Sequence, residues 1–525
     1  MDPLAFQLGN LLVGNKPGEA GLEITLNGPD LLFLGKAVVA ICGAPMECTL
    51  DGKPISMWKR TPIDPGQRLK IGKTTGGGCR SYLSVYGGFP TVAEWFGSKA
   101  TSPGVAVGGY QGRQLSAGDL LGTTKDVPEH LSTPLQLPEK LVPEYTKHWE
   151  ILAMVGPYDD GYLLPEDLEM IYATTWQISH NAARGGIRLI GPKPKWARKD
   201  GGEGGAHPSN VVEYGYPVGA LNWTGDDPCI FPVDCPDFGG FVSSTTIIKA
   251  DYWRLGQMKA GDTMRYRRVS LEDALAMRRL VNGFIESVAD ACAGSGSFDD
   301  IMPLDYSGLT ASTMSDNHGK ATLHQIEAQG TRPLTMYRQG ADDYLLVEYG
   351  EGNFDINHRC RVTALTKALR ESTGPISFSS GLVNTVGCCT SLLIYYDGTT
   401  VPQKQLLSYL IDLESQLGDL SKSKVPSRIF KLPITFESKR QTAAIQRYIE
   451  TQRPYASYLP DNVEFVAKNN GLERKDLEHI LTHSKLMAVS VGFFAALPLC
   501  LPVDPRERMN CPKVYISIPV WYLGH

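Results

Sequence analysis

A polar, glycine-rich block between residues 196 and 261 contains the residues best suited to chemistry. It holds two glycine clusters, at 201–205 and 239–240, and between them the tetrapeptide His207-Pro208-Ser209-Asn210. Glycines let the backbone approach a ligand closely, and binding residues are concentrated on loops. An imidazole, a hydroxyl and an amide at one loop supply both donors and acceptors. The block therefore predicts a site for a small polar ligand.

The elements that must position this block are mainly β. Residues 1–125 alternate short apolar runs with turn signals such as Asn27-Gly28 and Asp51-Gly52, which predicts antiparallel strands that close into a barrel. Residues 126–147 are rich in Pro, Glu and Lys and are expected to form a connector. We predict a helix over 168–179 and strands through 247–249. A second helix over 270–290 opens with a capping sequence that starts at Ser270.

A second unit is predicted from Arg332 onward. It follows residues 291–330, which are small, polar and weakly patterned, and which we expect to be a linker. The second unit alternates strands with helices, as in an α/β sandwich. Its predicted strands are 333–338, 343–350, 391–396 and 427–436, and its predicted helices are 357–372, 401–418, 442–451 and 474–482.

Composition excludes several classes of protein. The 525 residues are 42% hydrophobic with a net charge of −5, which gives no support for binding nucleic acid or an anionic membrane. No apolar run approaches the roughly 20 residues that span a bilayer, and the N-terminus has no secretory pattern. The eleven cysteines form no CxxC pair, so we expect reduced thiols in a cytoplasmic protein and no metal site.

Several long motifs carry a resemblance to a known family. RGGIRLIGPKPKWARKDGGEGGAHPSN, TGDDPCIFPVDCPDFGGF and WRLGQMKAGDT resemble the carboxyltransferase region of urea carboxylase and urea amidolyase. GLEITLNGPDLLF and CRSYLSVYGGFP are similar to the larger half of that region, the allophanate hydrolase subunit 2 type. YRQGADDYLLVEYG, DINHRCRV and VPSRIFKLPITF are similar to the smaller half, the subunit 1 type.

The resemblance implies a fold that is mainly β with α+β parts. A cyclophilin-like β-barrel forms the larger half, over residues 1–290. After the linker at 291–330, residues 331–525 are expected to form an α/β subdomain and an incomplete second cyclophilin-like barrel.

The resemblance also implies a reaction. Carboxybiotin, on a separate biotin carboxyl carrier domain, gives its carboxyl group to urea or a related amide, and allophanate is formed. ATP would enter only through a partner biotin carboxylase. His207, Ser209 and Asn210 are the catalytic candidates, because donors fixed on glycine-rich loops are already aimed at the reacting group.

Three more residues are candidates for binding the substrate under the same resemblance. Arg188 and Lys249 would hold the carboxylate, and Asp234 would accept hydrogen bonds from the NH groups of urea. Structural roles are open for the same residues: Asp234 as a turn cap, Asn210 as a loop brace, and Arg188 paired with Asp200 or Glu203.

The chain also departs from the family pattern. It starts at Met1-Asp2, inside a Gly-Pro-Met-Asp motif, and residues 514–525 match nothing in the family. We expect truncation at both ends, with this tail a product of a truncated or misspliced gene model. Two other functions stay open: a subunit of an ATP-dependent 5-oxoprolinase-like hydrolase, and a non-catalytic inhibitor of the kind found among bacterial relatives.

Overall fold

The computed structural model describes residues 1–510 except 125, 307–319, 452–453, 457 and 493–496. Its first lobe contains two antiparallel sheets that face each other across a shared apolar core. The first sheet has the order β1 (Leu22–Thr25), β8 (Arg80–Val85), β3 (Ala37–Gly43), β6 (Lys59–Ile63) and β9 (Leu135–Gln136). The second has the order β2 (Asp30–Leu32), β7 (Arg68–Thr74), β4 (Met46–Leu50) and β5 (Lys53–Pro54).

The lobe begins with a helix where the sequence predicts only strands. This helix, α1 (Pro3–Leu12), is capped by Asp2, whose side chain accepts a hydrogen bond from the backbone of Ala5. Proline at the first helical position costs nothing, since its missing N–H has no partner there. The leucines at 4, 8, 11 and 12 are buried against the first sheet, so helical spacing of apolar residues overrides the strand prediction.

The barrel expected in the larger half, residues 1–290, is confirmed, and its strands come from residues 148–268. The barrel predicted over 1–125 is wrong, because the strands of that segment form two open sheets. Seven strands close in the order β10, β17, β14, β15, β12, β11 and β18. Their bounds are β10 (His148–Val155), β11 (Trp176–Ala183), β12 (Gly186–Ile190), β14 (Ala220–Thr224), β15 (Asp227–Ile230), β17 (Ser243–Ile247) and β18 (Thr263–Arg268). Trp176 and Trp223 are fully buried in its core, with their rings in edge-to-face contact.

The helix predicted over 168–179 is wrong in its second half. Helix α2 (Pro165–Ala173) is followed by Thr174 in an extended conformation, and β11 begins at Trp176. Trp176 and Ile178 are buried while Gln177 is exposed, so the side chains alternate as in a strand. The capped helix at residue 270 is confirmed as α4 (Leu271–Ala293), and Ser270 accepts a hydrogen bond from the backbone of Asp273.

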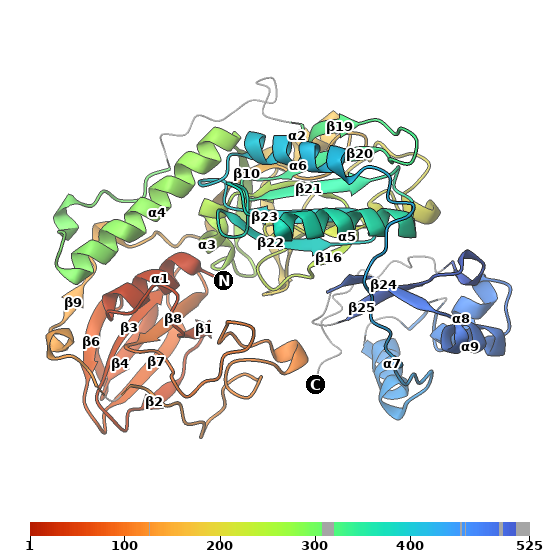
Figure 1. The fold of residues 1–525 in the computed structure, drawn as a ribbon. Helices are drawn as coiled ribbons and strands as arrows, with labels where there is room; N and C mark the ends of the chain where they lie inside the picture. The colour runs from red at the N-terminus through yellow and green to blue at the C-terminus, as the bar shows by residue number, and fades with distance from the viewer. Residues whose placement is uncertain (125, 307–319, 452–453, 457, 493–496, 511–525) are drawn as a thin grey trace.

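The second unit is a five-stranded antiparallel sheet with two helices beside it (Figure 1). The predicted strands at 333–338, 343–350 and 391–396 and both helices that flank them are confirmed. Strand β19 lies inside the predicted linker, and β22 was not predicted. The elements are β19 (Thr322–Ile326), β20 (Thr335–Gly340), β21 (Tyr344–Tyr349), β22 (Leu382–Gly387), β23 (Ser391–Tyr396), α5 (Ile356–Glu371) and α6 (Gln403–Leu417).

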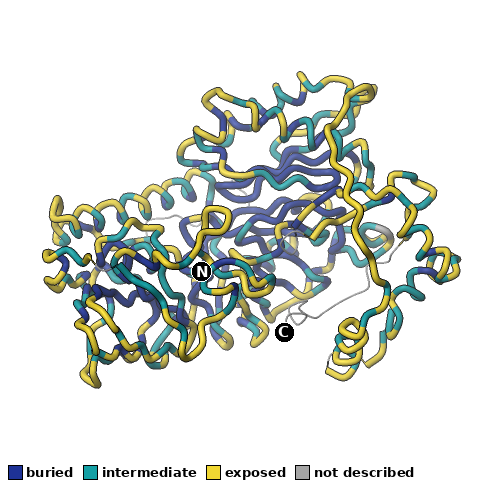
Figure 2. The backbone as a smooth tube through the Cα atoms, turned by 60° about the horizontal axis from the view of Figure 1, so that its bottom comes forward, coloured by how far each residue is buried: buried dark blue, intermediate teal, exposed yellow. Residues whose placement is uncertain are grey.

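A buried ion pair within this sheet contacts the barrel half through Tyr158. Arg338 donates through Nε to Glu348 at 2.9 Å, and Tyr158 of the barrel half donates to the other oxygen of Glu348 at 2.7 Å. All three side chains are buried, and the guanidinium of Arg338 lies over the ring of Tyr158. Figure 2 shows the resulting core as one buried region that runs through the barrel and the sheet.

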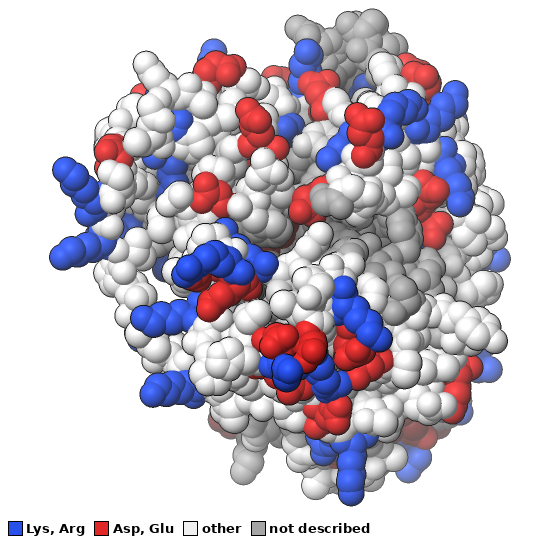
Figure 3. All heavy atoms as spheres, turned by 90° about the vertical axis from the view of Figure 1, so that its right-hand side faces the viewer, with Lys and Arg blue, Asp and Glu red and all other residues white. Residues whose placement is uncertain are grey.

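The C-terminal unit, residues 439–510, lies to the right of this body in Figure 1. It contains α7 (Lys439–Thr451), α8 (Asn462–Asn469), α9 (Arg474–His483) and a hairpin of β24 (Leu486–Val491) with β25 (Pro498–Pro502). The described residues of this unit form no closed barrel, and the tail at 514–525 lies outside the described residues. Basic and acidic side chains are interspersed on the face that this side of the molecule presents (Figure 3).

The strap, residues 418–438, connects α6 to the C-terminal unit. The strand predicted over 427–436 is wrong, because these residues belong to no sheet. Ile429 is 88% exposed, Phe430 70% and Leu432 78%. A run of β-forming residues needs a hydrogen-bonded neighbour to become a strand, and the described part of the chain supplies none here.

Membrane-spanning helices and metal clusters are both absent from the described residues. None of their helices is both long enough and apolar enough to cross a membrane. Their ten cysteines are all free, and no group of three His, Cys, Asp or Glu side chains is arranged to hold a metal ion.

Candidate functional site

The predicted residues His207, Ser209 and Asn210 lie together where the glycine-rich loop enters β13 (Asn210–Gly215). The His207 cluster consists of His207, Ser209 and Asp226. Ser209 Oγ lies 3.0 Å from His207 Nδ1, and the backbone N–H of Ser209 donates to the same nitrogen at 3.2 Å. His207 Nε2 lies 3.2 Å from Asp226 Oδ1. The consistent assignment places the ring proton on Nε2, directed at Asp226, and leaves Nδ1 as the acceptor.

The surroundings of His207 favour the neutral ring. Burial lowers the pKa of His207, and the nearby Asp226 carboxylate opposes that shift only in part. Trp196 packs edge-on against the imidazole and donates through Nε1 to Asp226 at 3.1 Å. The His207 side chain is 20% exposed, whereas Ser209 is fully buried behind it. His207 and Asp226, whose side chain is 36% exposed, are therefore the members of the cluster that a small molecule can reach.

Close backbone packing explains the glycines of the loop. A Cβ atom on Gly202 would lie 2.2 Å from the carbonyl oxygen of His207 and 2.7 Å from that of Asn210. Only glycine fits such a distance. Arg198 donates to the Asn210 carbonyl oxygen at 2.7 Å, so the loop is held from its other side as well. The Asn210 side chain itself is buried.

Arg188 lies next to the His207 cluster. It stands on β12 and donates through Nη1 to Thr224 Oγ1 at 3.3 Å. Thr224 precedes Gly225, whose N–H donates to Ser209 Oγ at 3.2 Å, and Asp226 follows. The β14–β15 turn thus brings Arg188 and His207 to the same side of the barrel.

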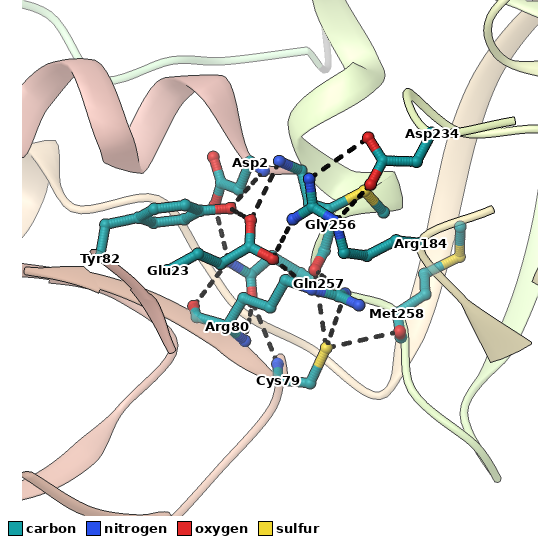
Figure 4. Close-up of polar contacts among 11 residues, drawn as sticks. Asp2, Glu23, Cys79, Arg80, Tyr82, Arg184, Asp234, Gly256, Gln257 and Met258 are labelled. Carbon is teal, nitrogen blue, oxygen red and sulfur yellow. Dashed lines mark hydrogen bonds and ion pairs between the residues drawn. The ribbon is translucent and has the colours of Figure 1, made fainter. Parts of the chain in front are cut away.

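Asp234 belongs to a different cluster, centred on Arg184 (Figure 4). The Arg184 cluster joins the first lobe to the barrel: Arg184 pairs with Asp234 at 2.6 Å and also with Glu23 of β1. Glu23 accepts a hydrogen bond from Tyr82 at 2.9 Å and lies 3.4 Å from Arg80 Nε. Asp234 is therefore engaged by a cation and is not a turn cap.

The charges of this cluster act strongly on Glu23. Burial alone would raise the pKa of its carboxyl, but the amino terminus, Arg184 and Arg80 outweigh it and hold the pKa at about 2. Behind the ion pairs, Gln257 accepts from the backbone N–H groups of Cys79 and Arg80 at 3.0 Å each. The cluster is thus a charged seam between two structural layers, with Arg184 and Asp234 at its half-exposed end.

Lys249 lies in a third place, where the barrel meets the second sheet. Its Nζ is 3.4 Å from Asp343 Oδ2 and 4.7 Å from the centre of the Tyr252 ring. Its backbone N–H donates to Asp342 at 2.9 Å. Burial raises the pKa of Asp343 to about 7, although Lys249 acts in the opposite direction. The six predicted site residues therefore occupy three places, and only four of them share one side of the barrel.

Sequence reasoning missed Asp226, Arg184 and Glu23. It also missed Glu213, a buried carboxylate on β13. Glu213 had a usable signal, because it is the only charge in the buried strand NVVEYG. Asp226 follows a turn glycine and resembles an ordinary turn residue. The contact between Arg184 and Glu23 joins residues 161 positions apart, and no local pattern announces it.

Comparison with known proteins agrees with this architecture. Residues 1–268 match the carboxyltransferase domain, subdomains A and B, and residues 335–517 match subdomains C and D. A protein of Emericella nidulans assigned as a urea carboxylase is 59% identical over 518 residues, which is 98% of this chain and 42% of that protein. A 5-oxoprolinase subunit of Escherichia coli is 31% identical over 293 residues, which is 55% of this chain and 88% of that protein.

A solved structure extends the likeness to the whole described fold. The crystal structure of the Kluyveromyces lactis urea carboxylase superposes with a TM-score of 0.84 at 35% identity, over 97% of this chain and 44% of that chain. The chain thus spans less than half the length of these two urea carboxylases. With both pairs of subdomains matched, the chain belongs to the carboxyltransferase family, as the carboxyltransferase region of the urea carboxylase type.

Proposed function

We propose that this chain transfers a carboxyl group from carboxybiotin to urea, or to a closely related amide, and forms allophanate. The observation that carries the proposal is the likeness to urea carboxylases over 97–98% of the chain, across both halves and the junction between them. The buried hydrogen bond from Tyr158 of the larger half to Glu348 of the smaller half supports it, because it joins the two halves that the reaction would need as one body.

The alternative functions have weaker support. The 5-oxoprolinase subunit of Escherichia coli relates to only 55% of the chain and leaves the second unit without a counterpart in that protein. A non-catalytic inhibitor would not need the ordered polar groups around His207. We therefore rank urea carboxylation first.

The groups beside His207 fit a carboxylated ureido group. When bound, carboxybiotin supplies the carboxyl group. Arg188 carries five N–H donors, one of which goes to Thr224, so it can orient a carboxylate. His207, neutral and half-buried, can hold or move a proton at the reacting nitrogen. In this proposal Ser209 and Asn210 fix the imidazole and the loop. Asp234 and Lys249, which pair with Arg184 and Asp343 at the two other places, are the remaining candidates for binding substrate.

The proposed reaction requires a defined division of the chain and two partner domains. We divide the chain into a larger half at 1–290, a linker at 291–330 and a smaller half at 331–525. A biotin carboxyl carrier domain would deliver the carboxyl group, and a biotin carboxylase would load it with the use of ATP. The free thiols of the ten described cysteines support a reducing compartment, the cytoplasm.

The direct test is urea-dependent loss of the labelled carboxyl group from a carboxylated biotin carrier domain mixed with the purified chain. We expect turnover that rises with urea and yields labelled allophanate. Stimulation by 5-oxoproline instead of urea would support the alternative. A folded protein that gives no urea-dependent transfer would refute the proposal.

A matched pair of variants locates the reaction. We expect Arg188→Gln to reduce kcat/KM for urea on the order of a hundredfold, because it removes a cation from the carboxylate. Arg68→Gln is the control, since Arg68 forms an exposed pair with Asp30 in the first lobe. Equal activities for the two variants would exclude Arg188 from the site.

A further inference from the structure

Glu213 lies at the meeting point of three segments that are far apart in the sequence. Its side chain is buried on β13. Its Oε1 atom accepts a hydrogen bond from the backbone N–H of Cys389 at 2.6 Å and another from the hydroxyl of Ser490. Cys389 lies just before β23 in the second sheet, and Ser490 lies on β24 of the C-terminal unit. One carboxylate therefore links the barrel half, the second sheet and the hairpin.

Packing on both sides keeps Glu213 at this junction. Strand β13 pairs with β16 (Phe238–Phe241) in a two-stranded ribbon outside the barrel. A Cβ on Gly215 would lie 2.6 Å from Leu393 of the second sheet. A Cβ on Gly492 would lie 3.0 Å from the ring of Phe238. The sheet presses against β13 and the hairpin against β16, and Figure 1 shows β16 between β22 and β24.

The charge at this junction is stabilised from one side by Arg359. Arg359 donates to the Cys388 carbonyl oxygen at 3.1 Å, next to the Cys389 N–H that binds Glu213. A buried carboxylate is costly unless hydrogen bonds and a cation compensate for lost water. Ser490, Cys389 and Arg359 together provide this compensation, and each comes from outside the ribbon. These contacts add to the hydrogen bond between Tyr214 of the ribbon and Ser243 of the barrel.

The ribbon leads directly to the candidate site. Asn210 begins the strand on which Glu213 stands, and Asn210 pairs with Phe241 of β16. Ser209, which binds His207, precedes Asn210. We propose that Glu213 is a positioning residue of the carboxyltransferase site: its carboxylate ties the end of the His207 loop to the β24–β25 hairpin. This inference rests on the function proposed above.

Three variants test the link, with one control. Glu213→Ala removes the acceptor, Glu213→Gln keeps an acceptor oxygen without the charge, and Ser490→Ala removes only the bond to the hairpin. Glu437→Gln is the control, because Glu437 lies in the strap with its side chain 75% exposed and pairs with Arg474 of α9. Each variant is made in the full chain and measured by hydrogen exchange of residues 207–215 and 486–491, and by urea-dependent transfer.

We expect Glu213→Ala and Ser490→Ala to speed exchange in both segments and to leave exchange in β10 and β18 unchanged. The kcat should fall on the order of tenfold with KM for urea within about twofold, since misplacement of a group affects the transition state most. Glu213→Gln should recover part of the loss.

Unchanged exchange at 207–215 in Ser490→Ala and in Glu213→Gln would overturn the inference, even where Glu213→Ala fails to fold. Faster exchange at 486–491 alone would also overturn it, because the hairpin would then be tethered without reaching the loop. If the wild-type chain shows no urea-dependent transfer, the proposed function fails, and the exchange data alone decide whether Glu213 fixes the His207 loop.

Discussion

The barrel and the C-terminal unit of this chain reach order in different ways. The barrel closes on itself through seven strands, and its core includes the fully buried rings of Trp176 and Trp223. In the described part of the C-terminal unit, only Ala467, Leu477 and Val489 are buried hydrophobic residues. Among the described residues its hairpin has two strands, and no third strand pairs with either edge. Closure and apolar burial make the barrel self-sufficient, whereas the C-terminal unit depends on its contacts with the body.

This difference matters for the site. His207, Ser209 and Arg188 stand on loops and strands of the barrel half, so their geometry is fixed before any partner arrives. The C-terminal unit contacts the barrel half at Ser490 and Gly492, so an effect of this unit on the site would pass through these contacts. The rigid part of the site and its adjustable part thus belong to different regions of the chain.

The largest effect is expected in the barrel core. Trp223 is fully buried between Trp176 and Trp196 and donates to Ser244 at 2.9 Å. We expect Trp223→Ala to lower the free energy of unfolding by about 3–5 kcal/mol, since it leaves a cavity and an unpaired hydroxyl. Denaturant unfolding followed by circular dichroism measures it. Trp95→Ala is the control, because Trp95 is 52% exposed. A similar loss of stability in both variants would contradict the view that burial in the barrel core causes the effect.

The next effect tests whether the barrel and the second sheet unfold together. Arg338→Ala leaves Glu348 buried without its cation and should cost about 3 kcal/mol in a single transition. Arg338→Met with Glu348→Leu should recover much of the loss. Lys367→Ala removes one side of an exposed pair with Glu371 and should change little. Two separate unfolding transitions in Arg338→Ala would show that the contact of Arg338 with Tyr158 had held two independent units together.

A smaller and local effect is expected in the C-terminal unit. Leu477 is the buried residue of α9. Leu477→Ala should destabilise this unit by about 2 kcal/mol and leave the barrel untouched. Hydrogen exchange in α8 and α9, with β10 as an internal reference, measures the local loss. An equal rise in exchange throughout the barrel would show that the two regions are one cooperative unit.

The pH dependence of stability tests the contact between the barrel and the second sheet at Lys249 and Asp343. Asp343 faces Lys249, Asp342 and Arg278, and burial raises its pKa from an ordinary value of 3.8 to about 7. The folded chain keeps this proton where the unfolded chain has lost it, so the group's contribution is full below pH 3.8. It is then lost as pH rises through about 7, by at most about 1.4 kcal/mol for each pH unit.

Asp343→Asn should flatten this slope. The measurement is the free energy of unfolding at several pH values between 4 and 8, for the wild type and the variant. Asp397→Asn, which alters a more exposed partner of Arg278, serves as the comparison. If the free energy of unfolding changes with pH equally in the wild type and in Asp343→Asn, other carboxyl groups cause the change.

The smallest effect is expected in the strap. Phe430→Ser should change the free energy of unfolding by less than about 0.5 kcal/mol, because the ring is 70% exposed. It should also raise solubility, since an apolar patch is removed. A large loss of stability would mean that the ring is covered in solution.

Local patterns predicted those parts of the fold that local physics determines. The cap at Ser270 marked α4, and the apolar runs at 344–349 and 391–396 marked β21 and β23. The barrel was expected and found, but turn signals cannot say which strands close it, so it was placed in the wrong segment. The strand over 427–436 failed because strand formation depends on a neighbour.

The same reasoning applies to the candidate site. Neighbours in sequence, such as His207 and Ser209, were grouped correctly because one loop carries both. Asp234 and Lys249 lie on other loops, and their partners Arg184 and Asp343 are far from them in the sequence. Long-range pairs of this kind arise from packing, which a single sequence does not display.

The closure of the barrel has a mechanical consequence. Its first and last strands, β10 and β18, lie side by side and parallel, from His148 opposite Thr263 to Ala153 opposite Arg268. A pull between the start of β10 and the end of β18 would slide one strand along the other and strain all of their hydrogen bonds together. Tension on the chain at these two points would therefore reach the barrel as shear, the direction in which paired strands resist separation best.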